Sequence, residues 1–327
     1  MKTLGKVLLI PAFCFMFMGC SNHEPVKKKE PEDSHITFSQ EEQKFEIIYM
    51  YDEMQDYIDT VREQTGKSNE TVFIEKVFEP FKKKSNMEEI SLRYTFKPSS
   101  EVDKLGQSIK ELEKNKDMTN RIIKEALLKS AKELPGKDKK YVILPANPED
   151  TFTVEQMGGV SGFVLSEYVI VLQLSPSVQE DILKYTVAHE YNHLIAEESN
   201  RGMIRGILGG VVLEGKADAF AHTIYPKIEV PWQEPMTTEE REKVVAEITE
   251  LRYSSDMKSY EKLREGISSK DIPQWANYKI GYEIVQSYRK NHPETSIERW
   301  TSMHEAEIIA GSDFEKITAY EGVSSND

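Results

Sequence analysis

The sequence predicts an α+β fold that is mainly helical, with a small sheet and a helical N-terminal lobe. Before position 135, three long stretches repeat apolar residues at the spacing of a buried helix face. Two short runs rich in β-branched residues, Tyr141–Leu144 and Phe163–Leu174, predict strands in the middle of the chain. Helical spacing returns after them, so helices should outweigh strands.

The first 20 residues are typical of a bacterial export signal. Two lysines precede an apolar run, Val7–Met18, that is shorter than the roughly 20 residues needed to cross a bilayer. The following Gly19-Cys20 pair completes a stretch that resembles a lipobox. We expect Cys20 to be lipidated and to anchor the protein outside the cytoplasmic membrane, with ordinary cleavage and secretion as the alternative.

Cysteine content and charge narrow the possible functions. Both cysteines of the chain, Cys14 and Cys20, lie within the predicted signal, so the mature protein would have no disulfide and no thiolate metal site. The formal net charge of −14 disfavours nucleic acid as a partner. The exported part should therefore be held together by its hydrophobic core alone.

Composition and spacing divide the chain into four segments. Residues 21–37 are rich in charge and proline and predict a disordered tether between the signal and the folded part. Pro135-Gly136 is a turn signal after the last helical stretch of the N-terminal part. We therefore expect a signal over residues 1–20, the tether, a helical lobe over 38–134 and a second domain over 135–327.

Within the N-terminal lobe, three helical stretches are expected. Ser39 with the acids after it predicts a helix start, followed by largely helical apolar spacing from Phe45 to Val61. Thr71–Lys84 and Ile109–Leu134 repeat this amphipathic pattern. In the second domain, further helices are expected over Thr238–Tyr253, Ala276–Asn291 and Ser296–Ile309.

The stretch that carries chemistry is Thr186–Ile195. It places His189 and His193 four residues apart, with Glu190 directly after the first histidine. On a helix this spacing turns both imidazoles to one face, about 40° apart. Two neutral imidazoles so placed can share a Zn²⁺ ion, and Glu190 can act on a water at the remaining coordination position. A hydrogen-bonded core histidine is the plainer alternative for either residue alone.

A second helical stretch, Val211–Phe220, supplies the carboxylates that such a site lacks. A catalytic zinc takes three protein ligands, so Glu214 is the candidate third ligand. Asp218 lies one turn further on the same face and could accept the outer N–H of a ligating histidine. Gly215 and the alanines beside it are small, which predicts a close approach to the histidine helix.

These residues resemble the gluzincin metallopeptidases, whose pattern is His-Glu-x-x-His followed by a glutamate ligand and an acid one turn later. More closely, they resemble a bacterial family of predicted zinc-dependent proteases, a domain of unknown function, over roughly Tyr141–Pro293. The resemblance implies a zincin-like catalytic domain with a small sheet and one Zn²⁺ per chain. It implies hydrolysis of a peptide or protein substrate with Glu190 as general base.

The resemblance also indicates a group that stabilises the oxyanion. Tyr278 and Gly281 match a Tyr-x-x-Gly element that several gluzincin families place at a similar distance from the glutamate ligand. This carries the role of hydrogen-bond donor onto the Tyr278 hydroxyl. A core position for Tyr278 is the plainer alternative, and His222, two turns after Glu214, is a rival donor.

Glycines before the second strand allow two explanations. Gly158, Gly159, Ser161 and Gly162 suit either a tight hairpin or bulge, or a sheet edge that pairs with an extended substrate. Aminopeptidases of the clan carry a glutamate there that holds the substrate's free amine, whereas this chain offers Ser161. Ser175-Pro176 predicts the start of the histidine helix.

The sequence therefore favours a zinc metallopeptidase, an endopeptidase rather than an aminopeptidase, anchored by lipid outside the cytoplasmic membrane. The alternative from another class is a non-catalytic envelope lipoprotein, a binding or scaffold module with a structural metal or none. Glu190 separates the two, because a purely structural site has no need of an acid at that position. The sequence makes no prediction of substrate preference or oligomeric state.

Overall fold

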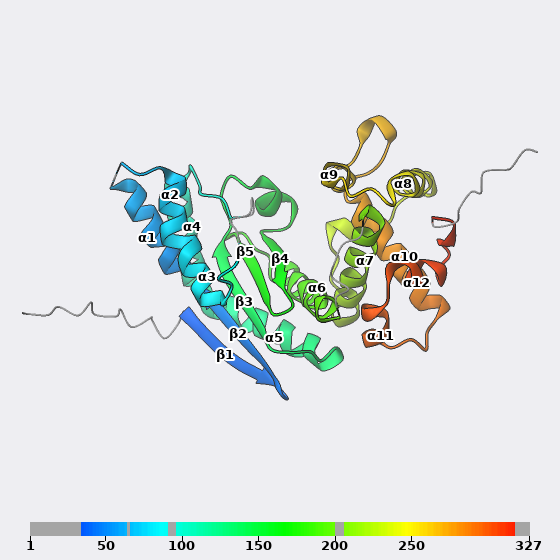
Figure 1. The fold of residues 1–327 in the computed structure, drawn as a ribbon, viewed down its shortest axis with the longest axis horizontal. Coiled ribbons are helices and arrows are strands. Elements are labelled where there is room, and N and C mark those ends of the chain that lie inside the picture. Colours follow the sequence, from blue (N-terminus) through cyan, green and yellow to red (C-terminus); the bar gives the residue numbers. More distant parts are fainter. Residues whose placement is uncertain (1–33, 64–65, 91–95, 200–205, 318–327) are drawn as a thin grey trace, which may run out of the picture. The chain divides into compact units, whose positions relative to one another are not determined.

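One mixed sheet organises the residues described by the computed structural model, which are 34–63, 66–90, 96–199 and 206–317 (Figure 1). Its order is β1-β2-β3-β5-β4. Neighbours β2, β3 and β5 run parallel, and the outer pairs β1/β2 and β4/β5 are antiparallel. The strands are β1 His35–Gln40, β2 Gln43–Tyr49, β3 Lys139–Pro145, β4 Val160–Ser166 and β5 Val169–Leu174.

The central strands explain why the sheet forms where it does. β3 and β5 are almost continuously apolar, and residues such as Val142, Ile143 and Val171 are fully buried. Parallel strands covered on both faces have this composition. The predicted strand Phe163–Leu174 is in fact two strands, because Glu167 and Tyr168 form a turn that reverses the chain.

The helix predicted to start at Ser39 begins only at Tyr51, so its second part is confirmed and its first part is wrong. Residues 35–49 instead form the hairpin β1–β2, with Glu41 at its turn in the left-handed region at φ 52°. Phe45, Ile48 and Tyr49 are spaced as on a helix face, but Phe45 and Ile47 also alternate as in a strand. Parallel pairing with β3 decides between the two, since it supplies backbone partners that the local spacing cannot reveal.

Two boundaries predicted from the sequence, at residues 37 and 135, fall inside the fold. Residues 35–37, which were assigned to the predicted tether, belong to β1, because this strand begins at His35. Strand β2 precedes Pro135-Gly136 and pairs with strand β3, which follows it. The domain boundary predicted at residue 135 therefore falls within one sheet, and residues 33–327 form one compact unit. The predicted export signal and the predicted lipidation site, Cys20, lie outside the described residues.

Helices of the N-terminal part pack against the sheet. α1 and α4 contact β3, while α5 lies between β1 and the histidine helix α6. Their bounds are α1 Tyr51–Arg62, α2 Asn69–Phe73, a π-helical turn Ile74–Phe78, α3 Glu79–Ser85, α4 Val102–Lys114 and α5 Lys116–Glu133. The predicted stretches Thr71–Lys84 and Ile109–Leu134 are thus helical, each divided into shorter helices.

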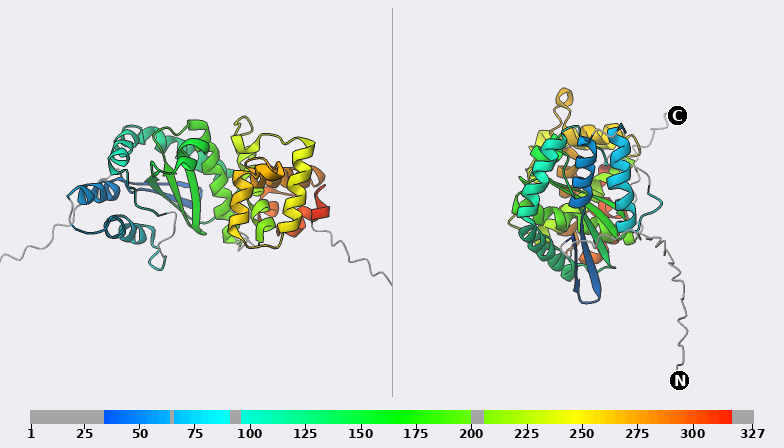
Figure 2. Two further views of the ribbon diagram at one scale, coloured as in Figure 1. Left: turned by 90° about the horizontal axis from the view of Figure 1, so that it is seen from above. Right: turned by 90° about the vertical axis from the view of Figure 1, so that its left-hand side faces the viewer.

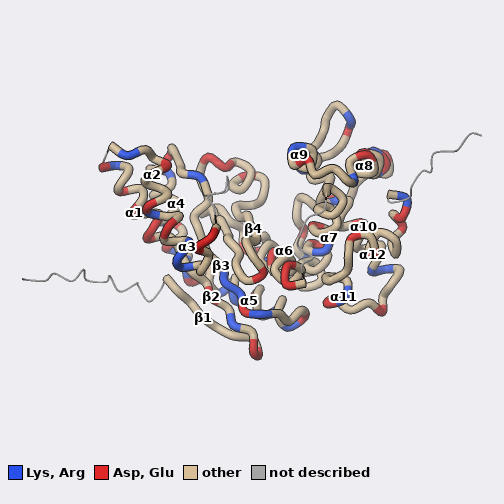
Figure 3. The backbone as a smooth tube through the Cα atoms, in the orientation of Figure 1, with Lys and Arg blue, Asp and Glu red and all other residues tan. Residues whose placement is uncertain are grey.

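The remaining helices gather on the other side of α6 from the sheet (Figure 2). They are α7 Gly206–Ile224, α8 Thr238–Leu251, α9 Met257–Glu265, α10 Ala276–Asn291, α11 Ile297–Ser302 and α12 Glu305–Ala310. α10 has the predicted bounds, whereas the single helix predicted over Ser296–Ile309 breaks at Met303. Acidic and basic positions are interspersed along the elements on both sides of α6 (Figure 3).

α6, Glu180–Glu198, lies between these two sets of helices and contacts β4, β5, α5 and α7. It begins after Gln179 and not at the predicted Ser175-Pro176, because Ser175 instead forms a turn with Ser177. The mainly helical α+β fold predicted from the sequence is confirmed. None of the helices in the described residues has the length and apolar character needed to span a membrane.

Candidate metal centre

α6 is buried around nearly its whole circumference, which brings its polar residues into the interior. Tyr185, Val187 and Ala188 are fully buried on different sides of the helix. His189 and Glu190 are only 6% and 7% exposed. Polar groups at such depth need partners, and the neighbouring helix α7 supplies those of His189.

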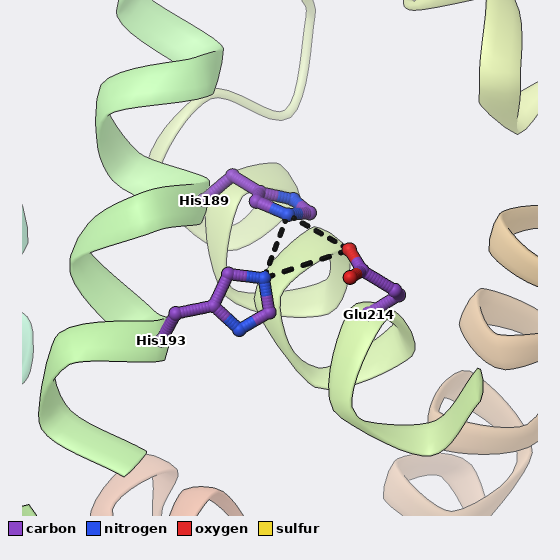
Figure 4. A group of neighbouring side chains, drawn as sticks. All are labelled: His189, His193 and Glu214. Carbon is purple, nitrogen blue, oxygen red and sulfur yellow. Dashed lines mark hydrogen bonds and ion pairs between the residues drawn. The ribbon is translucent and has the colours of Figure 1, made fainter. Parts of the chain in front are cut away.

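The two histidines of α6 and Glu214 of α7 converge (Figure 4). The Nε2 atoms of His189 and His193 are 3.0 Å apart. Oε2 of Glu214 lies 3.2 Å from Nε2 of His189 and 3.5 Å from Nε2 of His193. A tetrahedral Zn²⁺ with bonds of roughly 2.05 Å needs ligand atoms about 3.3 Å apart. These three residues fit that requirement and could hold a metal ion.

Asp218 orients the first histidine from behind. Its Oδ1 lies 2.9 Å from Nδ1 of His189. A carboxylate oxygen accepts, so Nδ1 carries a hydrogen, and Nε2 is the ring nitrogen that faces His193 and Glu214. Trp232 Nε1 and the Tyr185 hydroxyl also donate to this oxygen, at 3.1 and 3.2 Å. Trp232 and Tyr185 could not be recognised from the sequence, because neither belongs to a motif.

Burial and mutual charge shift the pKa values of the cluster in different directions. Burial raises the pKa of Glu190, although His193 and His189 oppose it. Burial also opposes ionisation of Glu214, but the two histidines outweigh it and hold the Glu214 pKa well below its usual range. Burial lowers the pKa of His189, but Asp218 and Glu214 outweigh it and hold that pKa well above its usual value. Glu190 is therefore the carboxyl whose environment favours taking up a proton.

The edge strand β4 runs directly against Glu190. A Cβ atom at Gly162 would lie 2.6 Å from Cδ of Glu190, so only glycine leaves room for this carboxyl group. Gly158 and Gly159 have φ values of 65° and 86° and form the turn that leads into β4. The glycines thus serve both a turn and the approach of an edge strand to Glu190, and Ser161 lies in that strand.

A cavity of about 650 Å³ opens at this point. Glu190, His189 and Ser161 contribute to its wall. The N-terminal helices also contribute apolar side chains, namely Met54 of α1, Phe73 of α2 and Leu105 of α4. The site is therefore open to a ligand between the sheet side and the C-terminal helices.

Among known protein families, the one described as "Predicted Zn-dependent protease (DUF2268)" matches residues 119–310. The chain belongs to this family. The matched residues include His189, His193 and Glu214. Strands β1 and β2 and helices α1 to α4 lie outside the matched residues. Comparisons with curated proteins and with solved structures give no match.

Tyr278 lies beside the metal cluster, whereas His222 does not line the cavity. The Tyr278 ring of α10 stacks on His189 with centroids 6.3 Å apart and contributes to the cavity wall. Burial, with Glu214 nearby, raises the Tyr278 pKa well above its usual value, so the hydroxyl stays protonated and can donate. His222 packs instead against Tyr282, with centroids 5.8 Å apart.

A glycine contact fixes the distance between α7 and α10. A Cβ atom at Gly215 would lie 2.0 Å from the Gly281 carbonyl oxygen, and one at Gly281 would lie 2.1 Å from the Val211 oxygen. The two helices therefore touch backbone to backbone. The prediction that Gly215 brings α7 close to α6 is wrong, since this glycine faces α10. The contact lies one residue from Glu214 and three residues from Tyr278.

Segment α11 connects the two ligand helices. Nδ2 of Asn192, which lies within the histidine motif of α6, donates to Thr301 Oγ1 at 3.0 Å. Nζ of Lys216 in α7 donates to the Thr301 carbonyl at 3.2 Å and to the Met303 carbonyl. Asn192 and Lys216 are both buried. The sequence could not reveal these contacts, because Thr301 lies 85 residues or more from either partner.

Proposed function

We propose that this protein is a zinc-dependent metallopeptidase that cleaves bonds within polypeptides. The observation that carries the proposal is the position of Glu190, whose carboxyl group lies in the cavity wall beside the His189–His193–Glu214 cluster and under the edge strand β4. A structural metal site needs no such acid, so the arrangement favours catalysis over a scaffold role.

The chain's own residues suit each part of the reaction. When bound by His189, His193 and Glu214, zinc would act as a Lewis acid and lower the pKa of a water molecule. Glu190 would accept the proton of the attacking water and then pass it to the leaving amine, which its raised pKa favours. The Tyr278 hydroxyl would donate a hydrogen bond to the carbonyl oxygen as negative charge develops on it.

Substrate would bind as an extended strand. β4 is an edge strand of the sheet, paired with β5 on one side, so its other side can pair with a peptide backbone. Ser161 lies in this strand and accepts a hydrogen bond from Thr153 at 3.0 Å. A serine gives a free substrate amine no charged partner there, which favours endopeptidase over aminopeptidase action.

The test is digestion of an unbiased peptide library by the zinc-loaded full chain and by its Glu190→Gln variant. The amide cannot accept a proton from water, so we expect Glu190→Gln to lose turnover. Glu197→Gln is the matched control on the same helix, outside the cavity wall, and should cleave like the wild type. Equal digestion by the wild type and Glu190→Gln would refute the proposed mechanism.

We also propose that the protein is anchored to the outer face of the cytoplasmic membrane by lipid on Cys20. The short apolar run followed by Gly19-Cys20 supports this. Cys20→Ala should leave an unprocessed precursor without a lipid label in cells fed labelled fatty acid, whereas Cys14→Ala should still be processed and labelled. Normal processing of Cys20→Ala would indicate an ordinary signal peptide.

A further inference from the structure

Arg264 of α9 is a cationic side chain in the wall of the cavity that contains Glu190. Its guanidinium carbon lies 4.4 Å from the centre of the Phe152 ring. Its backbone carbonyl accepts a hydrogen bond of 2.8 Å from the Trp275 amide. The Arg264 backbone is thus fixed by a hydrogen bond, and its guanidinium is positioned by a cation–π contact.

The guanidinium has cation–π contact but no anion. Its Nε is buried and has no hydrogen-bond partner in the part of the chain that the structure describes. No ion pair joins Arg264 to a carboxylate among those residues either. A half-buried guanidinium is costly to leave without an anion, and its planar set of N–H donors matches a carboxylate better than any other peptide group.

Glu149 and Asp150, the acids of the cavity wall other than Glu190, are already engaged by neutral donors. Glu149 accepts from the Ser100 amide at 2.7 Å, from the Ser100 hydroxyl at 2.6 Å and from the Ser99 hydroxyl at 3.0 Å. Asp150 accepts from the amide and hydroxyl of Thr153 at 3.2 and 2.6 Å. Lys97, the other cation of the wall, already has an interaction within the protein.

A row of aromatic contacts leads from Arg264 to the metal cluster. Phe152 packs on Trp275 with centroids 5.3 Å apart, and Trp275 packs on Tyr278 at 5.7 Å. Tyr278 in turn stacks on His189. An extended peptide advances about 3.3 Å per residue, so Arg264 lies within reach of a group a few residues from the cleaved bond.

We propose that Arg264 binds a carboxylate of the substrate, supplied either by an acidic side chain or by the C-terminus of the peptide. This rests on the proposed peptidase function and names the substrate class that the cavity prefers. A charge-assisted, bidentate contact in a partly desolvated site should favour a carboxylate over its amide by about ten- to a hundredfold.

The experiment uses the full chain loaded with Zn²⁺ and internally quenched peptides that are capped and amidated. A single Glu, Gln or Lys is moved along an otherwise fixed peptide. In the wild type, kcat/KM for the Glu peptide should exceed that for the Gln peptide at least tenfold at one position, mainly through KM. Arg264→Ala should bring this ratio to about one, and Arg264→Glu should favour the Lys peptide instead.

A parallel pair of peptides without acidic residues, one amidated and one with a free C-terminus, distinguishes the two sources of the carboxylate. A preference for the free C-terminus that Arg264→Ala removes assigns Arg264 to the end of the substrate. Arg62→Ala is the matched control, because Arg62 is a surface residue of α1 outside the cavity wall, paired with Asp103 at 2.6 Å. It should keep the wild-type preference.

Binding supplies a readout that needs no turnover. Fluorescence anisotropy of labelled Glu and Gln peptides on zinc-loaded Glu190→Gln, with and without Arg264→Ala, should show the same ten- to hundredfold difference in affinity. If Arg264→Ala fails to fold, Arg264→Lys keeps the charge but loses the planar set of donors and should retain only part of the preference.

The outcomes separate this proposal from the function on which it rests. Cleavage without any preference for a side-chain or terminal carboxylate overturns the role of Arg264 and leaves the peptidase intact. Carboxylate-selective binding that depends on Arg264, without cleavage by the wild type, supports the binding site and overturns the peptidase.

Discussion

The two helices that hold the metal cluster are supported in different ways. α6 packs on the sheet through β4 and β5, and its last turn is tied to β3 by the buried ion pair between Lys139 and Glu198. α7 is positioned by other helices, through its backbone contact with α10 at Gly215 and through Lys216, which reaches the end of α11. The histidines therefore depend on the sheet, whereas Glu214 depends on the C-terminal helices.

The two halves of the cluster therefore have different main supports, although α11 bonds to both ligand helices. Changes on the α7 side should displace Glu214 and Tyr278 while the histidine pair stays in place, since α6 keeps its contacts with the sheet. Changes beside Glu190 should affect catalysis and leave the positions of the histidines and of Glu214 unchanged. Variants on either side of the cluster test this difference.

Gly215→Ala should be the most damaging single change. Its Cβ would lie 2.0 Å from the Gly281 carbonyl oxygen, and backbone cannot swing aside as a side chain can. Forcing α7 from α10 should lower the free energy of unfolding by about 3 kcal/mol and weaken zinc binding. Urea unfolding and zinc titration measure the two effects.

Gly106→Ala is the matched control in α4. Its Cβ would meet Arg62 Nη2 at 3.5 Å, an ordinary contact, so the variant should gain up to about 1 kcal/mol from helix propensity. If Gly215→Ala unfolds at the same urea concentration as Gly106→Ala and binds zinc as tightly, the glycine contact does not position α7.

Tyr278→Phe removes only the hydroxyl that we assign to the oxyanion. It should bind zinc and unfold like the wild type while losing about a hundredfold in turnover, equivalent to about 2.7 kcal/mol of transition-state stabilisation. His222→Ala, outside the cavity wall, should turn over substrate normally. The reverse pattern in steady-state kinetics would move the role to His222.

Lys216→Met keeps most of the side-chain volume but removes the donor to the carbonyls of Thr301 and Met303. Leaving these acceptors unpaired should cost about 2 kcal/mol of unfolding free energy and weaken zinc binding, because Lys216 lies two residues from Glu214. Lys129→Met, on the half-exposed surface of α5, should change stability by less than about 0.5 kcal/mol. Equal thermal stability of the two variants would contradict the role of Lys216.

Gly162→Ala should have the smallest and most local effect. The new Cβ would press on the flexible end of Glu190, which can turn away at little cost to the fold. We expect zinc content and stability to be kept, and turnover to fall about tenfold, or about 1.4 kcal/mol of barrier. Full activity in this variant would mean that Glu190 acts from another position.

How far the sequence predicts this molecule depends on how local the determining contacts are. The histidine motif, Glu214 and Asp218 could be located from spacing, because one helix face is decided within a few residues. α10 was predicted with its observed bounds for the same reason. β2 was mistaken for part of a helix because one of its pairing partners, β3, lies about 90 residues further along the chain.

The supporting groups of the site were invisible for the same reason. Trp232 reaches Asp218 through a 3₁₀ turn, Pro231–Gln233, and Arg264 reaches the cavity only because the chain from α9 folds back along α10. Gly215 was recognised as a site of close approach, but it was assigned to the wrong neighbour. Each of these depends on which helices meet, and a single sequence does not specify that.

The most direct test of the central claim is the zinc content of the purified full chain, measured by mass spectrometry of the metal after dialysis. The two-helix cluster predicts about one zinc per chain in the wild type and in Glu190→Gln, and almost none in Glu214→Gln, whose amide is a poor replacement for a carboxylate ligand. Full zinc content in Glu214→Gln, or its loss in Glu190→Gln, would contradict the assignment of ligand and general base.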